Sequence, residues 1–307
     1  MIKISKIFFI FLIVLLITNV KTLNADVASF VNIINGAQPA AMGEAYTSRP
    51  ECIYSLEFNP AGIAFTDSSQ FTFSHTEYYS DLKNDYFAFS RGRDRISWAA
   101  NVKLFSLDDV ERDAVGNQTG SFTNRSYQLK LAGAYKLHEK LSVGIGANYY
   151  RETIYKTNSS ACGIDFGLEL ANIRINKKNQ FNLGISAQNI STKMSFGGNH
   201  FKIPEKLRFG GSVVTSGLLN NFLKKTTFAA DYVINRYEDN SLNFGMEFAA
   251  GRNFSLRCGY IDYMDKDTKS IMTFGGGLGY KFGQLDYAYR NHRDLDSTHT
   301  FTFTVNF

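Results

Sequence analysis

The last ten residues, "THTFTFTVNF" from Thr298 to Phe307, alternate apolar side chains with threonine and asparagine. Successive side chains of a β-strand point to opposite faces, so this pattern predicts a strand with one apolar and one polar face. The apolar face carries Phe301, Phe303, Val305 and Phe307. Two environments suit such a strand, namely the core of a soluble sandwich or the lipid around a membrane barrel. The rest of the chain decides between them.

The first residues resemble a secretory signal peptide. Lys3 and Lys6 precede an unbroken apolar run of eleven residues from Ile7 to Ile17, and the small residue Ala25 closes the segment. A membrane anchor helix would need about 20 apolar residues. We therefore expect a signal peptide over residues 1–25 and an exported mature chain.

From residue 70 onward the chain consists of short alternating runs, with no helical periodicity of comparable length. A tilted strand needs about 9–11 residues to cross a bilayer, whereas sandwich strands average about 5–6. Most of the runs are close to the longer value. The fourteen predicted strands are Gln70–Tyr79, Asn84–Arg91, Arg95–Phe105, Arg125–Leu137, Lys140–Glu152, Ala161–Ile173, Gln180–Ile190, Lys206–Thr215, Thr226–Arg236, Ser241–Ala250, Asn253–Tyr263, Ser270–Lys281, Gln284–Arg290 and Thr298–Phe307.

The connections between these strands alternate in length. Long ones, such as Ser106–Asn124 and Ser191–Glu205, occupy every second position, and short ones, such as Phe282–Gly283, occupy the others. Outer-membrane barrels have longer extracellular loops and short periplasmic turns. One inner connection, Ser216–Lys225, is too long for this pattern.

The two faces of the predicted strands differ in the same sense along the chain. One face is apolar, as in Leu129, Leu131, Phe244 and Phe248. The other face carries the charges Lys130, Lys136, Asp165, Glu169, Arg208, Asp231, Glu247, Arg257, Asp286 and Arg290. The pattern predicts an all-β transmembrane antiparallel β-barrel of about fourteen strands over residues 70–307. Its last strand pairs with the first, and its final apolar residues face lipid and act as the assembly signal.

The ten predicted lumen charges comprise five cations and five anions. Ionised groups away from water need partners, because unpaired burial is costly. Balanced signs therefore favour paired charges in a filled lumen, with Arg290 or Arg257 meeting Asp286 or Glu247. The alternative is that the charges line ordinary water.

The segment before the first strand, residues 26–69, has a different composition. It contains "INGAQPAAMGEAYTSRPECIYSLEFNPAGIA" from Ile34 to Ala64, which is rich in small residues suited to close packing. Pro60 disfavours a helical conformation at Asn59, so this pair predicts a turn. The segment either folds into the lumen or leads into the barrel from the periplasm.

Several motifs in the chain are similar to those of one family. The motif positions of the first segment are Gly36, Ala37, Met42, Gly43, Ala45, Tyr46, Asn59, Pro60, Ala61 and Gly62. Further matches are "IPEKLRFGGSVV", "LRCGY", "GGGLGYKFGQLDYAYR" and the terminal "THTFTFTVNF". With these, the chain resembles the PorV/PorQ family, which belongs with the FadL-like outer-membrane transporters. The resemblance implies a fourteen-stranded barrel with an N-terminal hatch in the lumen.

Two departures from that family concern the hatch. The family often has glycine where Glu44 stands, and acidic residues where "SRPECIYSLEF" runs. The resemblance also implies two alternative functions. PorV serves type IX secretion by handling exported cargo, whereas FadL-like proteins pass hydrophobic compounds through the outer membrane.

The expected partners follow from this assignment. They are outer-membrane lipid, the barrel assembly machinery, and either secreted cargo and secretion components or a hydrophobic ligand, with the barrel itself monomeric. The net charge of +5 is scattered and indicates no nucleic-acid binding.

No catalytic or metal-binding constellation is visible in the sequence. The five histidines are far apart and the three cysteines are widely spaced, without His-x-x-x-His or Cys-x-x-Cys motifs. The glycine-rich stretch Gly275–Gly279 lies within strand pattern, so it predicts a smooth barrel wall rather than a phosphate loop. We expect a non-enzymatic protein without cofactor or metal, the alternative being an esterase or protease whose groups assemble only in space.

Overall fold

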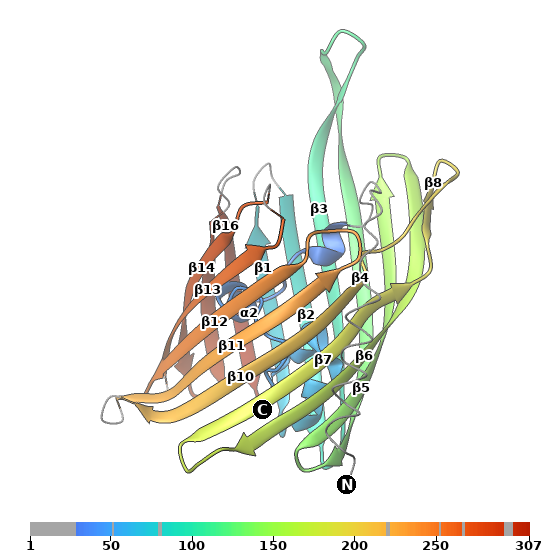
Figure 1. The fold of residues 1–307 in the computed structure, drawn as a ribbon. Coiled ribbons are helices and arrows are strands. Elements are labelled where there is room, and N and C mark those ends of the chain that lie inside the picture. Colours follow the sequence, from blue (N-terminus) through green and yellow to red (C-terminus); the bar gives the residue numbers. More distant parts are fainter. Residues whose placement is uncertain are drawn as a thin grey trace.

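The computed structural model describes residues 29–50, 52–78, 82–218, 222–251, 253–265, 268–291 and 297–307. The signal peptide expected over residues 1–25 lies outside these ranges. The described chain forms a closed antiparallel barrel of fourteen strands (Figure 1). This confirms the predicted fold class and strand number. Within the described residues, no helix has the length and apolar character needed to cross a membrane.

Neighbouring strands in the barrel are consecutive in sequence, apart from the closing pair β1–β16 and the pair β7–β10, which is connected through a small separate sheet, β8–β9. The barrel strands are β1 Ser69–Glu77, β2 Leu82–Arg93, β3 Ile96–Arg112, β4 Gln118–His138, β5 Leu141–Ile154, β6 Thr157–Arg174, β7 Asn179–Ser191, β10 Lys206–Leu218, β11 Leu223–Asn235, β12 Ser241–Ala250, β13 Phe254–Tyr263, β14 Ile271–Tyr280, β15 Gly283–Arg290 and β16 Thr298–Asn306. The two strands of the separate sheet are β8 Met194–Phe196 and β9 Asn199–Phe201.

The largest correction concerns the predicted loop Ser106–Asn124. Instead of a loop, β3 and β4 continue as a paired hairpin from Ser106↔Arg125 to Arg112↔Gln118. This hairpin stands well beyond the other loops (Figure 1). Its residues lack a continuous apolar face because both faces lie in water, so a search for membrane-crossing alternation misses it.

Two other connections also contain strand. The over-long inner connection Ser216–Lys225 is taken up by β10 and β11, which pair as far as Leu218↔Leu223. The outer connection Ser191–Glu205 contains the β8–β9 hairpin. The connections at one end of the barrel are therefore still longer than those at the other end. We call the end with the β3–β4 hairpin the loop end and the end with Ser69 and Phe307 the turn end, and we assign the turn end to the periplasm.

The barrel closes between its first and last strands. β1 and β16 pair from Gln70↔Asn306 to Glu77↔His299, as the terminal alternation predicts. Phe301, Phe303 and Phe307 are 52%, 45% and 68% exposed on the outer face. The intervening threonines of β16 are buried, which places them on the lumen side.

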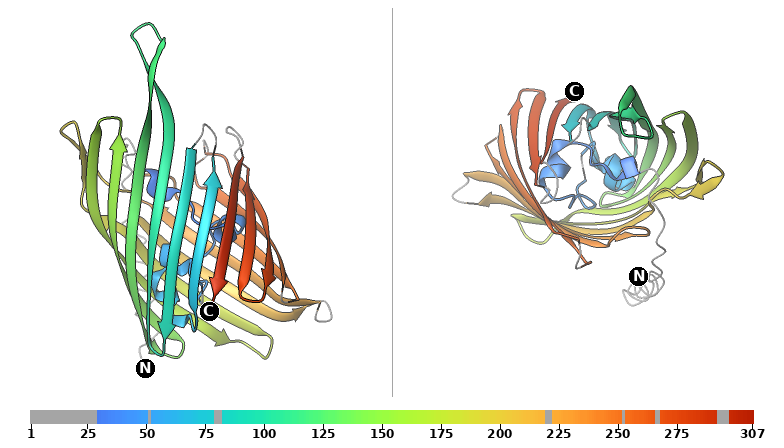
Figure 2. Two further views of the ribbon diagram at one scale, coloured as in Figure 1. Left: turned by 180° about the vertical axis from the view of Figure 1, so that it is seen from behind. Right: turned by 90° about the horizontal axis from the view of Figure 1, so that it is seen from above.

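Residues 29–66, which we call the plug, lie inside the barrel (Figure 2). The plug contains four short helical elements, namely η1 Ser29–Asn32, α2 Ala37–Ala41, α3 Ser55–Phe58 and η2 Pro60–Phe65. The turn predicted at Asn59–Pro60 is the start of η2. Asn59 has an extended backbone, and its side-chain Oδ1 accepts a hydrogen bond from the Ala61 N–H at 3.2 Å.

The main apolar core lies between the plug and the inner wall. Plug residues such as Met42, Tyr46 and Leu56 are fully buried there, against small wall residues such as Ala99 and Ala132. Small side chains on the wall leave the volume that the plug side chains occupy, because protein interiors pack without large voids. The lumen is therefore a folded protein core.

Candidate functional site

The inner wall approaches the plug at glycine positions. A Cβ atom added to Gly259 would lie 2.1 Å from the backbone N of Gly43, and one added to Gly167 would lie 2.2 Å from Oδ1 of Asn59. Gly43 itself has φ +58°, and its own Cβ would lie 2.7 Å from the backbone N of Tyr260. The predicted hatch motif Gly36–Gly62 therefore contacts the wall at backbone distance, because glycine alone leaves room there.

Two buried carboxylates of the wall, those of Asp231 and Glu169, bind the plug directly. Oδ2 of Asp231 accepts the N–H groups of Tyr46 and Thr47 at 2.9 Å each, and the Thr47 hydroxyl at 2.6 Å. Oε2 of Glu169 accepts the Asn59 side-chain amide at 2.6 Å. Both carboxylates thus take part in fixing the position of the two plug turns that carry the motif.

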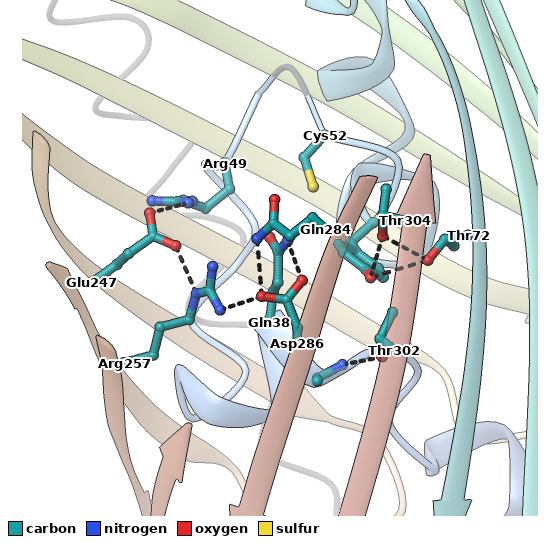
Figure 3. A network of polar contacts seen from close by, with 12 residues as sticks. Gln38, Arg49, Cys52, Thr72, Glu247, Arg257, Gln284, Asp286, Thr302 and Thr304 are labelled. Carbon is teal, nitrogen blue, oxygen red and sulfur yellow. Dashed lines mark hydrogen bonds and ion pairs between the residues drawn. The ribbon is translucent and has the colours of Figure 1, made fainter. Parts of the chain in front are cut away.

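A network of opposite charges joins the plug to strands β12, β13 and β15 (Figure 3). Arg257 donates from Nε to Glu247 and from Nη1 to Asp286, both at 2.7 Å. From the plug, Arg49 donates to Glu247 at 3.0 Å and Gln38 donates to Asp286 at 3.0 Å. These side chains are largely shielded from solvent, so each charge needs its partners.

A second ion pair lies on the opposite part of the wall. Nζ of Lys130 is 2.9 Å from Oδ2 of Asp165, and both side chains are almost fully buried. The same ammonium donates to the Leu56 carbonyl of the plug at 3.2 Å. Lys136, in contrast, is only partly buried, and its ammonium lies 5.5 Å from the centre of the Phe65 ring.

Glu44 binds two further predicted lumen cations. Its Oε1 accepts from Nη1 of Arg290 at 2.7 Å, and its Oε2 is 3.7 Å from Nη2 of Arg208. Of the two arginines expected to meet Asp286 or Glu247, Arg257 meets both. Arg290 instead pairs with Glu44, because the plug places this carboxylate beside it. Burial alone would raise the pKa of Glu44, but the neighbouring cations, Arg290 foremost, hold the pKa below its ordinary value.

Sequence reasoning missed the charges that the plug contributes and one lysine of the wall. Glu44, Arg49 and Glu57 lie in a segment without alternation, so their orientation had no sequence signal. Lys103 could have been found from the alternation of β3. It is buried and donates to three plug carbonyls, those of Phe30, Val31 and Ile33, at 3.1, 3.3 and 2.6 Å.

Two polar hollows lie at the turn end between plug and wall. The larger, about 630 Å³, is lined by residues that include Arg49, Lys140, Arg174 and Asn182. The smaller, about 290 Å³, is lined by residues that include Arg49, Cys52 and Glu247. In the described part of the chain, no group of three or more histidine, cysteine and acidic side chains could hold a metal ion.

Comparison with known proteins gives one family match. The family model described as type IX secretion system protein PorV matches residues 18–232, which is more than half of the chain. No curated protein sequence matches the chain.

Solved structures with the same fold include three transporters or their homologues. The Pseudomonas putida toluene transporter TodX has a TM-score of 0.58 at 12% identity, over 87% of this chain and 96% of its own. The Ralstonia pickettii toluene transporter TbuX has a TM-score of 0.57 at 12% identity, over 89% and 98%. A Pseudomonas aeruginosa FadL homologue has a TM-score of 0.53 at 10% identity, over 90% and 99%. At these identities the similarity shows the fold alone.

Proposed function

The chain belongs to the family of the type IX secretion system protein PorV, and from this premise we propose that it is a non-enzymatic interaction barrel for protein export. It lies in the outer membrane, keeps its lumen closed, and meets secreted cargo or secretion components at its loop end. The observation that carries this proposal is the attachment of the plug to the wall by buried charges on several strands.

The charge pairs favour a closed lumen over a passage for apolar compounds. Removing one partner of a buried ion pair costs about 3–5 kcal/mol, because the other charge is left uncompensated. Moving the plug aside would separate Arg49 from Glu247 and Glu44 from Arg290 together. A path for hydrophobic molecules needs an apolar lining with few polar groups, which this set of side chains would not provide.

The β3–β4 hairpin supports a role in contacts outside the membrane. It projects beyond the other loops of the barrel (Figure 2). Asp108, Asp109 and Asp113 are exposed along it, and Val115 at its tip is 83% exposed. The hairpin thus presents an acidic, two-stranded surface outside the membrane, on which we infer that the partner binds.

A second candidate function is the uptake of hydrophobic small molecules. It is favoured by the fold shared with proteins that are described as toluene transporters. This function would require the plug to leave the lumen or to rearrange within it.

One experiment separates the two functions. In the source bacterium, residues 108–123 are replaced by Asn-Gly, which joins the paired residues Leu107 and Asn124 through a two-residue hairpin turn. We expect protein export into the medium to fall sharply while uptake of an aromatic hydrocarbon stays unchanged. Heat-modifiable migration on gels checks that the shortened barrel still folds. Normal export by the shortened protein, together with hydrocarbon uptake that is lost on deletion of the gene, would favour the transport function.

A further inference from the structure

A hollow on the outer surface at the turn end takes no part in the proposed function. It has a volume of about 750 Å³ and is lined by Arg91, Arg93, Asp94, Arg95, Ile96, Trp98 and Tyr135, from strands β2, β3 and β4 and the turn between β2 and β3. We propose that this hollow binds the phosphate headgroup of an anionic phospholipid of the periplasmic leaflet, with the acyl chains lying along the adjacent apolar wall.

Strand alternation places Arg91 and Arg93 on the lipid side of the barrel, and Arg95 is exposed in the turn that follows. In β2 the burial pattern alternates, with Ala88 and Ser90 toward the lumen, so Phe87, Phe89, Arg91 and Arg93 share the outer face. On this outer face, two aromatic residues are followed by two arginines at the end of the strand. This order is typical of the boundary between the hydrocarbon core and the lipid headgroups.

The pairing of the strands brings the lining residues together. Arg91 lies opposite Trp98, and Ile96 lies opposite Tyr135 of β4. Trp98 itself lies opposite Gly133 of β4, next to the hollow. No atom lies within 4 Å of the position that a Cβ on Gly133 would occupy. The missing side chain therefore leaves open space beside the indole ring.

The charged side chains of the hollow are mostly cationic, and these cations are free to bind an anion. Asp94 is the one acidic residue of the lining, and its Oδ2 lies 3.8 Å from Nε of Arg93 with both side chains more than four-fifths exposed. Such exposed pairs contribute little, because water screens them. Arg91 and Arg95 form no ion pair with any carboxylate in the described part of the chain. Guanidinium groups suit phosphate oxygens, because their planar donors bind two oxygens at once.

The hollow continues into the lipid-facing surface, which is why we assign a lipid rather than a protein as its occupant. The Phe89 ring lies 5.2 Å from the Trp98 ring and 6.3 Å from the Phe307 ring, measured between centroids. These rings form an unbroken apolar strip directly beside the arginines. A lipid whose headgroup binds the arginines thus has its acyl chains beside these aromatic rings. Basic sites of this kind retain anionic lipids.

The test uses the fluorescence of Trp98, which is the one tryptophan of the chain. The full-length protein is reconstituted into phosphatidylcholine vesicles that contain a minor fraction of brominated phosphatidylglycerol or, in parallel, of brominated phosphatidylcholine. Bromine quenches tryptophan at short range, so the ratio of the two quenching levels measures enrichment of the anionic lipid at the hollow. We expect brominated phosphatidylglycerol to quench more strongly at equal mole fraction.

The triple variant Arg91→Gln, Arg93→Gln, Arg95→Gln is expected to abolish this difference, and the single variant Arg95→Gln to lower the preference roughly fivefold. The matched control removes three cations from other turns at the same end, Lys140→Gln, Lys177→Gln and Lys178→Gln, and should leave the preference unchanged. Heat-modifiability establishes that each variant is folded. Native mass spectrometry of the unmodified protein with phosphatidylglycerol gives a second readout.

Three outcomes would overturn the proposal. The first is equal quenching by the two brominated lipids, and the second is a preference that the triple variant retains. The third is a preference that inorganic phosphate removes at constant ionic strength, because this would indicate a site for free anions.

Discussion

Arg290 of β15 donates a hydrogen bond to Glu44 of the plug at 2.7 Å, although the two residues are 246 positions apart in the chain. Glu44 has φ 63°, a left-handed conformation that costs a non-glycine residue about 1–2 kcal/mol. The Glu44 carboxylate offsets this conformational cost, because one of its oxygens pairs with Arg290 and the other lies near Arg208.

The first prediction concerns reversal of this pair. Arg290→Glu places a second carboxylate beside Glu44, so we expect the free energy of unfolding in detergent micelles to fall by about 3–5 kcal/mol. The double variant Arg290→Glu with Glu44→Arg should recover part of the loss. Reversal of the exposed turn residue Lys177 serves as a control. A loss of less than about 1 kcal/mol would instead place the pair in ordinary water.

The second prediction concerns the pH dependence of stability. Because the pKa of Glu44 is depressed below its ordinary value of 4.5, its contribution is fully present above that pH and is lost as the pH falls through the lower, folded-state pKa. Glu44→Gln should therefore be less stable than the wild type at neutral pH, and the difference should shrink below pH 4.5. Denaturant unfolding at pH values from neutral to below 4.5 measures this difference in stability, with Glu139→Gln at an exposed turn as control. A difference that is constant with pH would contradict the ionic role.

The third prediction concerns the close approach of plug and wall. Gly259→Ala brings a methyl group to 2.1 Å from the backbone N of Gly43, so something must shift, and overpacking of this kind costs about 1–3 kcal/mol. Gly133→Ala on the outer face meets no atom within 4 Å and should change stability by less than about 0.5 kcal/mol. Equal thermal stability of the two variants would show that the plug is not seated against β13.

The fourth prediction concerns conductance. The intact protein should be nearly non-conducting in planar bilayers, whereas deletion of residues 26–62 should open a water-filled pore. Shortening the β3–β4 hairpin removes chain from outside the lumen and should leave the barrel closed. Should the truncated barrel not fold, the double variant Asp231→Ala with Glu169→Ala, which lacks two carboxylates that bind the plug, is expected to show transient openings. A wide and steadily open pore in the intact protein would refute occlusion by the plug.

The fifth prediction concerns insertion into the membrane. Phe307→Asp puts a charge on the lipid face at the end of the closing strand, where such substitutions are unfavourable. We expect a severalfold smaller heat-modifiable fraction in outer-membrane preparations. Asn306→Asp adds the same charge one position earlier on the opposite face and should assemble normally. Similar assembly of both variants would argue against Phe307 as part of the assembly signal.

Alternation along the chain was sufficient to predict the barrel wall. The face of a strand residue depends only on its immediate neighbours, so the lumen side of Asp231 and the lipid side of Phe244 could be assigned without any tertiary information. The same reasoning failed where this local signal is absent. The β3–β4 hairpin stands in water on both faces, and the plug has no periodicity from which the direction of Glu44 or Arg49 follows.

The sequence by itself therefore determined the fold class, the number of strands, the closing pair and the face of wall charges such as Asp231 and Arg257, because these rest on a repeat of two residues. The tertiary structure alone decided which charges the plug adds to the wall. Arg257 meets Glu247 and Asp286, as the balanced lumen charges predicted. Arg290 instead pairs with Glu44, because the plug brings this carboxylate to β15 from 246 positions away in the chain. It also decided where the outer hollow forms, since the register of β2, β3 and β4 places Arg91 opposite Trp98 and Ile96 opposite Tyr135.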